Sequence, residues 1–90
     1  MSSPQFSEIE YKLIGEGISY AMECCKEEPI NTYGVIISKH PEFIVSVKNA
    51  NEKFSEGISE GIYVYCMVQY WDDNTIQMRY QGGFSEFIKI

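Results

Sequence analysis

The first third of the chain has the hydrophobic spacing of an amphipathic helix. Between residues 8 and 27, apolar side chains recur at intervals of three and four positions, which places them on one helical face. Ser7 and Glu10 have the spacing of a capping box, in which each side chain bonds the backbone N–H of the other residue. Pro29 prevents continuation, because its ring disfavours the helical region for the preceding residue. The pattern predicts one helix over residues 8–27.

A second interpretation divides the same segment in two. Residues 8–14 alternate between apolar and polar types, as a half-buried strand does, and Gly15 and Gly17 follow. Each glycine inside a helix costs about 1 kcal/mol relative to Ala. A strand over 8–14 and a helix over 17–27 is therefore the alternative. The single helix is favoured because it accounts for the capping box, and Gly17 would then let a sheet approach the helix closely.

The middle of the chain has the composition of β-strands. β-branched residues are frequent in 33–38 and 43–47, and residues 39–42 between them have turn character, so the three segments predict a hairpin. Residues 49–60 are more polar, and they predict a short helix or a loop.

Three further strands are predicted in the C-terminal third. Residues 62–71 are apolar on both faces, which is typical of a central strand, and residues 75–81 alternate between apolar and polar types. Turn residues occupy 72–74 and 82–83, and residues 84–90 predict a closing strand.

The predicted order is a helix, two strands, a short helix or loop, and three strands. An antiparallel sheet of four to five strands, covered on one face by the N-terminal helix, accommodates this order and belongs to the α+β class. Ninety residues suffice for one two-layer core, so residues 1–90 are predicted to form a single domain.

The register of the hairpin formed by 62–71 and 75–81 follows from the apolar pattern. A three-residue turn pairs Val68 with Met78 and Tyr70 with Ile76, which keeps the apolar partners on one face. The opposite face then carries aromatic residues, Met and one Arg among uncharged polar residues, a composition typical of protein interfaces. The residues predicted to bind a partner are Tyr63, Tyr65, Met67, Trp71 and Arg79.

The charge balance is acidic, with 13 Asp and Glu, seven Lys and Arg, and a net charge of -6. Nucleic-acid-binding proteins usually carry a basic stripe, so direct binding of DNA or RNA is not expected. No apolar run approaches the roughly 18 residues of a membrane helix, and residues 1–6 lack the features of a signal peptide. Three cysteines make a poor disulfide framework, and together these features predict a cytoplasmic protein.

Few residues have the spacing that catalysis or metal binding requires. His40 is the only histidine, and an activated nucleophile needs such a base beside it. Cys24, Cys25, Cys66 and His40 match the ligand count of zinc, but adjacent cysteines lack the pair spacing of structural zinc sites. The sequence therefore predicts neither an enzyme nor a bound metal or cofactor, and it favours thiols that act as small buried apolar groups.

Small size, acidity and an aromatic sheet face together predict a non-enzymatic protein-binding module. Small acidic domains often inhibit basic or nucleic-acid-handling proteins, as immunity and phage anti-defence proteins do, because negative charge steers the encounter. Two alternatives stay open. One is a homodimer that buries the same face or pairs its C-terminal strand edge to edge. The other is a domain that binds a small ligand between helix and sheet.

Overall fold

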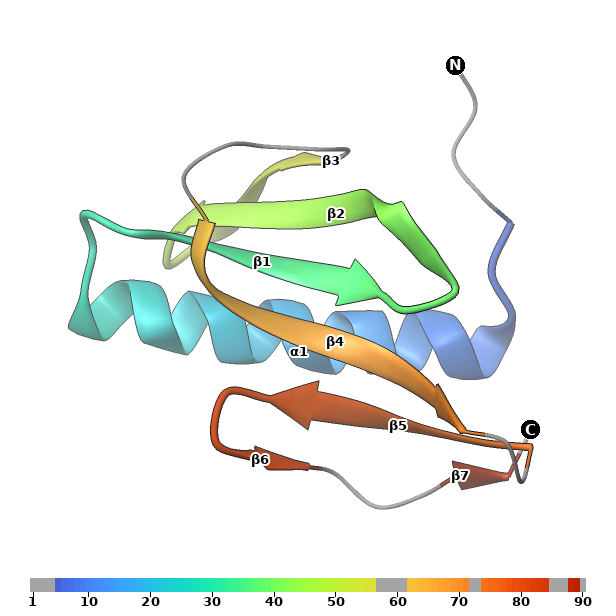
Figure 1. Ribbon diagram of the computed structural model, residues 1–90. Coiled ribbons are helices and arrows are strands. Elements are labelled where there is room, and N and C mark those ends of the chain that lie inside the picture. Colours follow the sequence, from blue (N-terminus) through green and yellow to red (C-terminus); the bar gives the residue numbers. More distant parts are fainter. Residues whose placement is uncertain (1–4, 57–61, 72–73, 85–87, 90) are drawn as a thin grey trace.

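The computed structural model describes residues 5–56, 62–71, 74–84 and 88–89. In this part of the chain, one long helix lies against one face of a seven-stranded sheet (Figure 1). The elements in chain order are α1 (Glu8–Glu27), β1 (Thr32–Ile37), β2 (His40–Asn49), β3 (Glu52–Glu56), β4 (Ile62–Trp71), β5 (Thr75–Tyr80), β6 (Gly83–Phe84) and β7 (Ile88–Lys89). The predicted α+β class, with an N-terminal helix packed on the sheet, is confirmed; the sheet has seven strands instead of the four to five predicted and is mostly, rather than wholly, antiparallel.

Helix α1 is a single element with the predicted capping box. The Ser7 hydroxyl accepts a hydrogen bond from the backbone N–H of Glu10 over 3.2 Å, and the Glu10 carboxylate accepts one from the backbone N–H of Ser7 over 2.6 Å. At the other end, Glu28 leaves the helical conformation directly before Pro29. The alternative strand over residues 8–14 is wrong. Caps that satisfy the free N–H groups of the first turn stabilise a helix there.

Gly17 lies where the helix comes closest to the sheet. A Cβ atom at this position would lie 3.0 Å from Val35 Cγ1 and 3.0 Å from Met78 Cε. The Gly17 carbonyl also accepts a hydrogen bond from the Cys66 thiol on β4, over 3.7 Å. The expected packing role of this glycine is confirmed, because a side chain at this position would crowd Val35 and Met78.

The strand order is β3-β2-β1-β4-β5-β6, and β7 also pairs with β5. Strands β1 and β4 are parallel, whereas the other pairs are antiparallel. Strand β4 lies between β1 and β5, which explains why it is apolar on both faces. The chain between these two parallel strands includes β2, β3 and residues 57–61, and the last of these lie outside the described residues.

Residues 52–56 correct the prediction of a short helix or loop over 49–60. They form β3, which pairs with β2. Strand β2 continues to Asn49, whose side-chain oxygen accepts a hydrogen bond from the backbone N–H of Asn51 over 2.9 Å and so reverses the chain. The following residues can then pair with the otherwise open edge of β2. The remainder of the predicted segment, 57–60, lies outside the described residues.

The turn between β4 and β5 has the predicted length of three residues. Val68 pairs with Met78 and Tyr70 pairs with Ile76, so the register inferred from the apolar pattern is confirmed. Asn74 closes the turn with φ 63°, a left-handed conformation that Asn tolerates better than most residues. The turn between β1 and β2 is shorter than predicted, because β2 begins at His40. The predicted closing strand appears as the two short strands β6 and β7.

The core fills the layer between α1 and the sheet. Its largest cluster joins the helix to the four central strands and consists of Leu13, Ile14, Val35, Ile37, Val45, Cys66, Val68, Ile76 and Met78. A second cluster at the C-terminal half of α1 consists of Ala21, Cys25, Tyr33 and Val47. Alternate residues of the same strands therefore point away from the helix.

Candidate outer-face binding site

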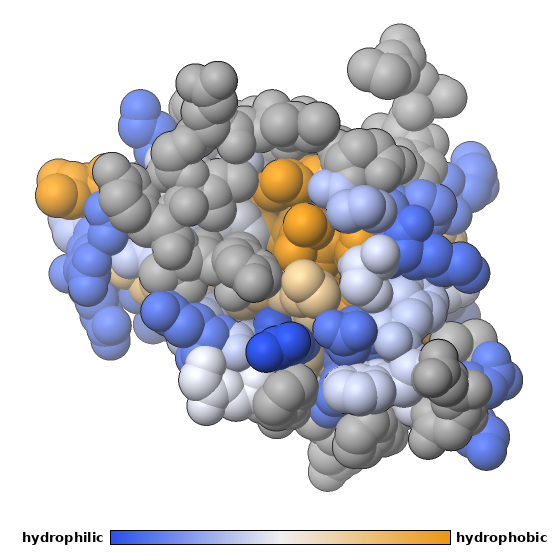
Figure 2. Space-filling model, in the orientation of Figure 1, coloured by the Kyte–Doolittle hydropathy of each residue, from blue (hydrophilic) through white to orange (hydrophobic). Residues whose placement is uncertain are grey.

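We call the side of the sheet that faces away from α1 the outer face. Figures 1 and 2 view the molecule from this side, with α1 behind the sheet. Ile44 is paired with Ile36, Ile36 with Met67, and Met67 with Arg79, so these four residues form one row across β2, β1, β4 and β5. Apolar side chains gather at the centre of this face, with hydrophilic ones around them (Figure 2).

Three of the five predicted partner-binding residues have described side chains on the outer face. Trp71 is 43% exposed, Arg79 is exposed, and Met67 is half-buried. Met67 and Trp71 lie four residues apart on β4, which corresponds to roughly 13 Å along a strand. Because both residues belong to a central strand, the backbone holds their spacing fixed.

Tyr63 and Tyr65 are described only as backbone. Both belong to β4, and Tyr65 is paired with Gly34 of β1. The register of β1 and β4 shifts between the pairs Thr32–Ile62 and Tyr33–Val64, next to Tyr63. The exposure of the two tyrosine side chains lies outside what the structure describes.

Several polar residues of the outer face are buried. The exposed fraction is 0% for Ser46, 2% for Gln77 and 9% for Thr75. The Ser46 hydroxyl has no hydrogen-bond partner among the described residues. The outer face is therefore not uniformly open to solvent, although Trp71 and Arg79 are exposed on it.

Sequence reasoning missed the contribution of β1 and β2 to this face. Ile36 and Ile44 are half-buried there, beside Met67. Their alternation with core residues is visible in the sequence and could have placed them on an outer face. Their position next to Met67 could not be read, because it depends on the parallel pairing of β1 with β4.

The carboxylates of α1 lie on the other side of the molecule. The helix carries five Glu and two Lys. Glu23 and Lys26 form an exposed ion pair over 2.9 Å, which contributes little to stability because solvent screens it. The negative charge of the helix is thus separated from Arg79 and the outer face by the thickness of the sheet.

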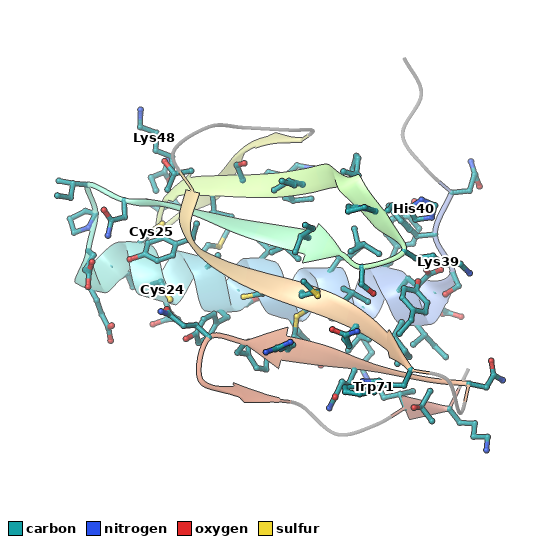
Figure 3. The ribbon with its side chains drawn as sticks, viewed as in Figure 1. Cys24, Cys25, Lys39, His40, Lys48 and Trp71 are labelled. Carbon is teal, nitrogen blue, oxygen red and sulfur yellow. The ribbon has the colours of Figure 1, made fainter. Side chains whose placement is uncertain are left out.

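Of the potential zinc ligands, His40 lies far from Cys24 and Cys25. His40 is at one end of the sheet, whereas Cys24 and Cys25 are near the other end of α1 (Figure 3). The His40 ring packs edge-on against Phe6, with 5.6 Å between the ring centroids. Among the described residues, no three His, Cys, Asp or Glu side chains are close enough together to hold a metal ion.

Two of the three thiols are buried as small apolar groups, as predicted. Cys25 and Cys66 are each 1% exposed, and both donate to backbone carbonyls, Cys25 to Val47 over 3.5 Å and Cys66 to Gly17. Burial raises the pKa of the Cys66 thiol to about 12. Cys24 is only partly buried, and its pKa is raised mainly by burial, although a hydrogen bond with Tyr20 lowers it.

On the core side of the sheet, one buried polar atom of the described residues has no hydrogen-bond partner among them. The Tyr70 hydroxyl is buried and makes no hydrogen bond with the described residues. The Lys39 ammonium lies 5.2 Å from the centre of the Tyr70 ring, a cation–π contact with the aromatic face rather than with the hydroxyl. Tyr80, which also lies on this side, packs against Tyr20 with 4.9 Å between ring centroids.

Comparisons of this chain with protein-family models, with curated proteins and with solved structures give no match. In the described part of the chain, no helix combines the length and the apolar character needed to cross a membrane.

Proposed function

We propose that this chain is a small, acidic, non-enzymatic protein-binding module, an inhibitor of the immunity or phage anti-defence type. In this proposal the outer face docks a protein partner through Tyr63, Tyr65, Met67, Trp71 and Arg79. The observation that carries the proposal is Trp71, a large aromatic side chain that stays 43% exposed on a central strand.

The chemistry around Trp71 supports this role. Trp and Arg are the residues most enriched among those that dominate binding energy at interfaces, and Met adapts to partners of irregular shape. Arg79 and Met67 are direct neighbours across β4 and β5, and Trp71 is paired with Thr75 four residues further along β4. A partner that covers Trp71 would therefore also reach polar groups that can form hydrogen bonds at the rim.

The charge distribution supports a basic or nucleic-acid-handling partner through steering. The net charge of -6 attracts a positively charged protein over distances comparable to the Debye length, about 8 Å at physiological salt. At the outer face itself, such a partner would place a neutral or acidic group against Arg79. The proposal includes no direct contact with nucleic acid or membrane, and it places the three free thiols in the reducing cytoplasm.

Replacement of Trp71 by Ser tests the proposal. Because Trp71 is 43% exposed, we expect Trp71→Ser to lower the free energy of unfolding by only about 1 kcal/mol, well below the 3–5 kcal/mol of a buried aromatic. A tagged wild-type protein should retain a specific protein from a lysate of its source cells, and Trp71→Ser should lose it. Isothermal titration with that purified partner then measures the loss, expected to exceed tenfold in Kd.

Tyr11→Ser is the matched control. Tyr11 is an aromatic residue that is 58% exposed on α1, away from the outer face. It should leave the affinity unchanged. Equal losses for both variants, or a drop of several kcal/mol in the stability of Trp71→Ser, would contradict the proposal.

A homodimer is the second candidate, favoured by the row of half-buried apolar residues Ile36, Ile44 and Met67. Burial of such a row in a symmetric contact removes apolar area from water. Light scattering at low and high protein concentration separates the two candidates. A stable dimer that Met67→Glu dissociates would assign the outer face to self-association.

A further inference from the structure

The edge formed by β3 has an irregular pairing with β2. Between the pairs Ser46–Ser55 and Val47–Lys53, β2 advances by one residue and β3 by two. Between Val47–Lys53 and Asn49–Glu52, β2 advances by two residues and β3 by one. Two opposite offsets thus occur within a strand of five residues. Offsets of this kind bend and twist a strand, so its outward N–H and C=O groups do not form a regular row.

Among the described residues, the opposite edge consists of two short strands. Strands β6 and β7 have two residues each, and both pair with β5. From the pair Arg79–Phe84 to the pair Ile76–Ile88, β5 advances by three residues and the closing segment by four. The register therefore shifts by one residue between the two short strands. A regular added strand needs about five consecutive residues to pair with, and neither β6 nor β7 provides them.

Charged side chains accompany both irregular edges. Lys53 is exposed on β3 and Lys89 is exposed on β7. Lysine at an edge opposes pairing with another strand, because its charge would have to be brought against the added chain. Short strands, offsets and lysines are three independent means by which proteins prevent strand addition, and all three occur here.

We infer that both edges of this sheet are closed to strand addition. Neither a second copy of the chain nor an extended peptide pairs with β3 or β7, so the edge-to-edge homodimer expected as an alternative does not form. This inference also bears on the protein partner, and in that respect it rests on the proposed function. The partner would bind over the outer face and would not add a strand to an edge of the sheet.

Backbone amide hydrogen exchange tests the inference without any knowledge of the partner. The wild-type protein is measured at low and high concentration, and again with an excess of a synthetic peptide of residues 74–81, the segment that contains β5. We expect the exchange rates of β3, β6 and β7 to be unchanged by concentration and by peptide. Slower exchange in any of these strands would overturn the inference.

Deletion of Ser85 shortens the chain between Phe84 and Ile88 by one residue, so that its length equals the three-residue step on β5. Ser85→Ala, which loses the side chain but keeps the chain length, is the matched control. If the shift closes this edge, the deletion variant should show a mass that rises with concentration and slower exchange in β7, whereas Ser85→Ala should behave as wild type. A folded deletion variant without these changes would overturn the role of the shift.

Circular dichroism shows whether the deletion variant folds. If it does not fold, the exchange measurement on the wild-type protein still tests the inference. The outcome is also separate from that of the proposed function. If hydrogen exchange shows closed edges but Trp71→Ser binds the partner as tightly as wild type, only the proposed docking site is rejected. If amide exchange slows at β3 or β7, only the inference about the edges is rejected.

Discussion

At the scale of single residues, α1 and the sheet are tightly packed around Gly17. Gly17 meets Val35 and Met78, and its carbonyl receives the Cys66 thiol. A β-branched residue such as Val35 has one strongly preferred rotamer in many settings, so it cannot easily move aside. The small size of Gly17, Cys25 and Cys66 therefore allows the helix to lie close to the sheet.

Gly17→Ala should destabilise the protein although Ala is the better helix former. The added Cβ would lie 3.0 Å from Val35 Cγ1, and overpacking of this kind costs typically 1–3 kcal/mol, against about 1 kcal/mol gained in helix propensity. We expect a net loss of about 1 kcal/mol in urea unfolding. Gly15→Ala is the control, because no atom lies within 4 Å of its Cβ position, and it should raise stability. A stabilised Gly17→Ala protein would contradict the close contact.

Because burial raises the pKa of the Cys66 thiol, we expect the protein to lose stability at alkaline pH. The pKa of this thiol is raised from 9.0 to about 12 in the folded protein by burial, so above pH 9 the unfolded chain releases this proton while the folded chain keeps it. The contribution is fully present below pH 9 and is lost as the pH rises toward 12, at about 1.4 kcal/mol per pH unit. Cys66→Ala should show a shallower decline between pH 9 and 11 in urea unfolding. Parallel curves for wild type and variant would exclude the effect.

At the scale of elements, local hydrogen bonds decide where the helix begins and where β2 turns into β3. The Ser7–Glu10 capping box and the turn closed by Asn49 are both formed by residues three or fewer positions apart. The first was readable from the sequence, because a capping box has fixed spacing. The second was not, because an Asn can cap a helix as well as it can close a turn, and only the open edge of β2 distinguishes the two.

Ser7→Ala should weaken the start of α1. It removes the acceptor for the Glu10 N–H, and loss of an N-cap side chain costs about 1 kcal/mol. The expected result is a decrease of that size in the free energy of unfolding, with faster amide exchange in the first turn. Ser19→Ala, an exposed position in the middle of the same helix, should be neutral or slightly stabilising. Equal effects at the two positions would show that the cap contributes nothing.

At the scale of the whole molecule, α1 and the sheet form a two-layer structure whose two sides differ in chemistry. The extents are 38 × 32 × 18 Å, and the shortest dimension is that of one helix layer on one sheet layer. Carboxylates of α1 lie on one side, and Trp71 and Arg79 lie on the other. The layer between them buries Cys25 and Cys66, so access of solvent to these thiols requires the layers to separate.

The three thiols should therefore react with an aromatic disulfide reagent at two different rates. At pH 8, Cys24 should react in the native protein, whereas Cys25 and Cys66 should react only at the rate of global opening, because both are 1% exposed and burial raises the pKa of each. In strong denaturant all three should react together. Cys24→Ser identifies the fast phase by its disappearance. If all three thiols react at the same rate in native buffer, the helix and the sheet do not shield Cys25 and Cys66 from solvent.

The sequence by itself determined the features that depend on neighbours along the chain. These are the single helix with its cap, the β1–β2 hairpin, and the three-residue turn that sets the register of β4 and β5. Each follows from periodicity, from turn chemistry or from the requirement that apolar partners share a face, and all of these act over a few residues.

Only the tertiary structure decided the features that depend on residues far apart in the chain. The parallel pairing of β1 with β4 places Ile36 beside Met67, and the edge of β2 converts residues 52–56 into a strand. The burial of Ser46 and Gln77 on the outer face belongs to the same group. The physical reason is shared: strand pairing between distant segments is chosen by competition for open edges and apolar faces, which no local pattern of residues records.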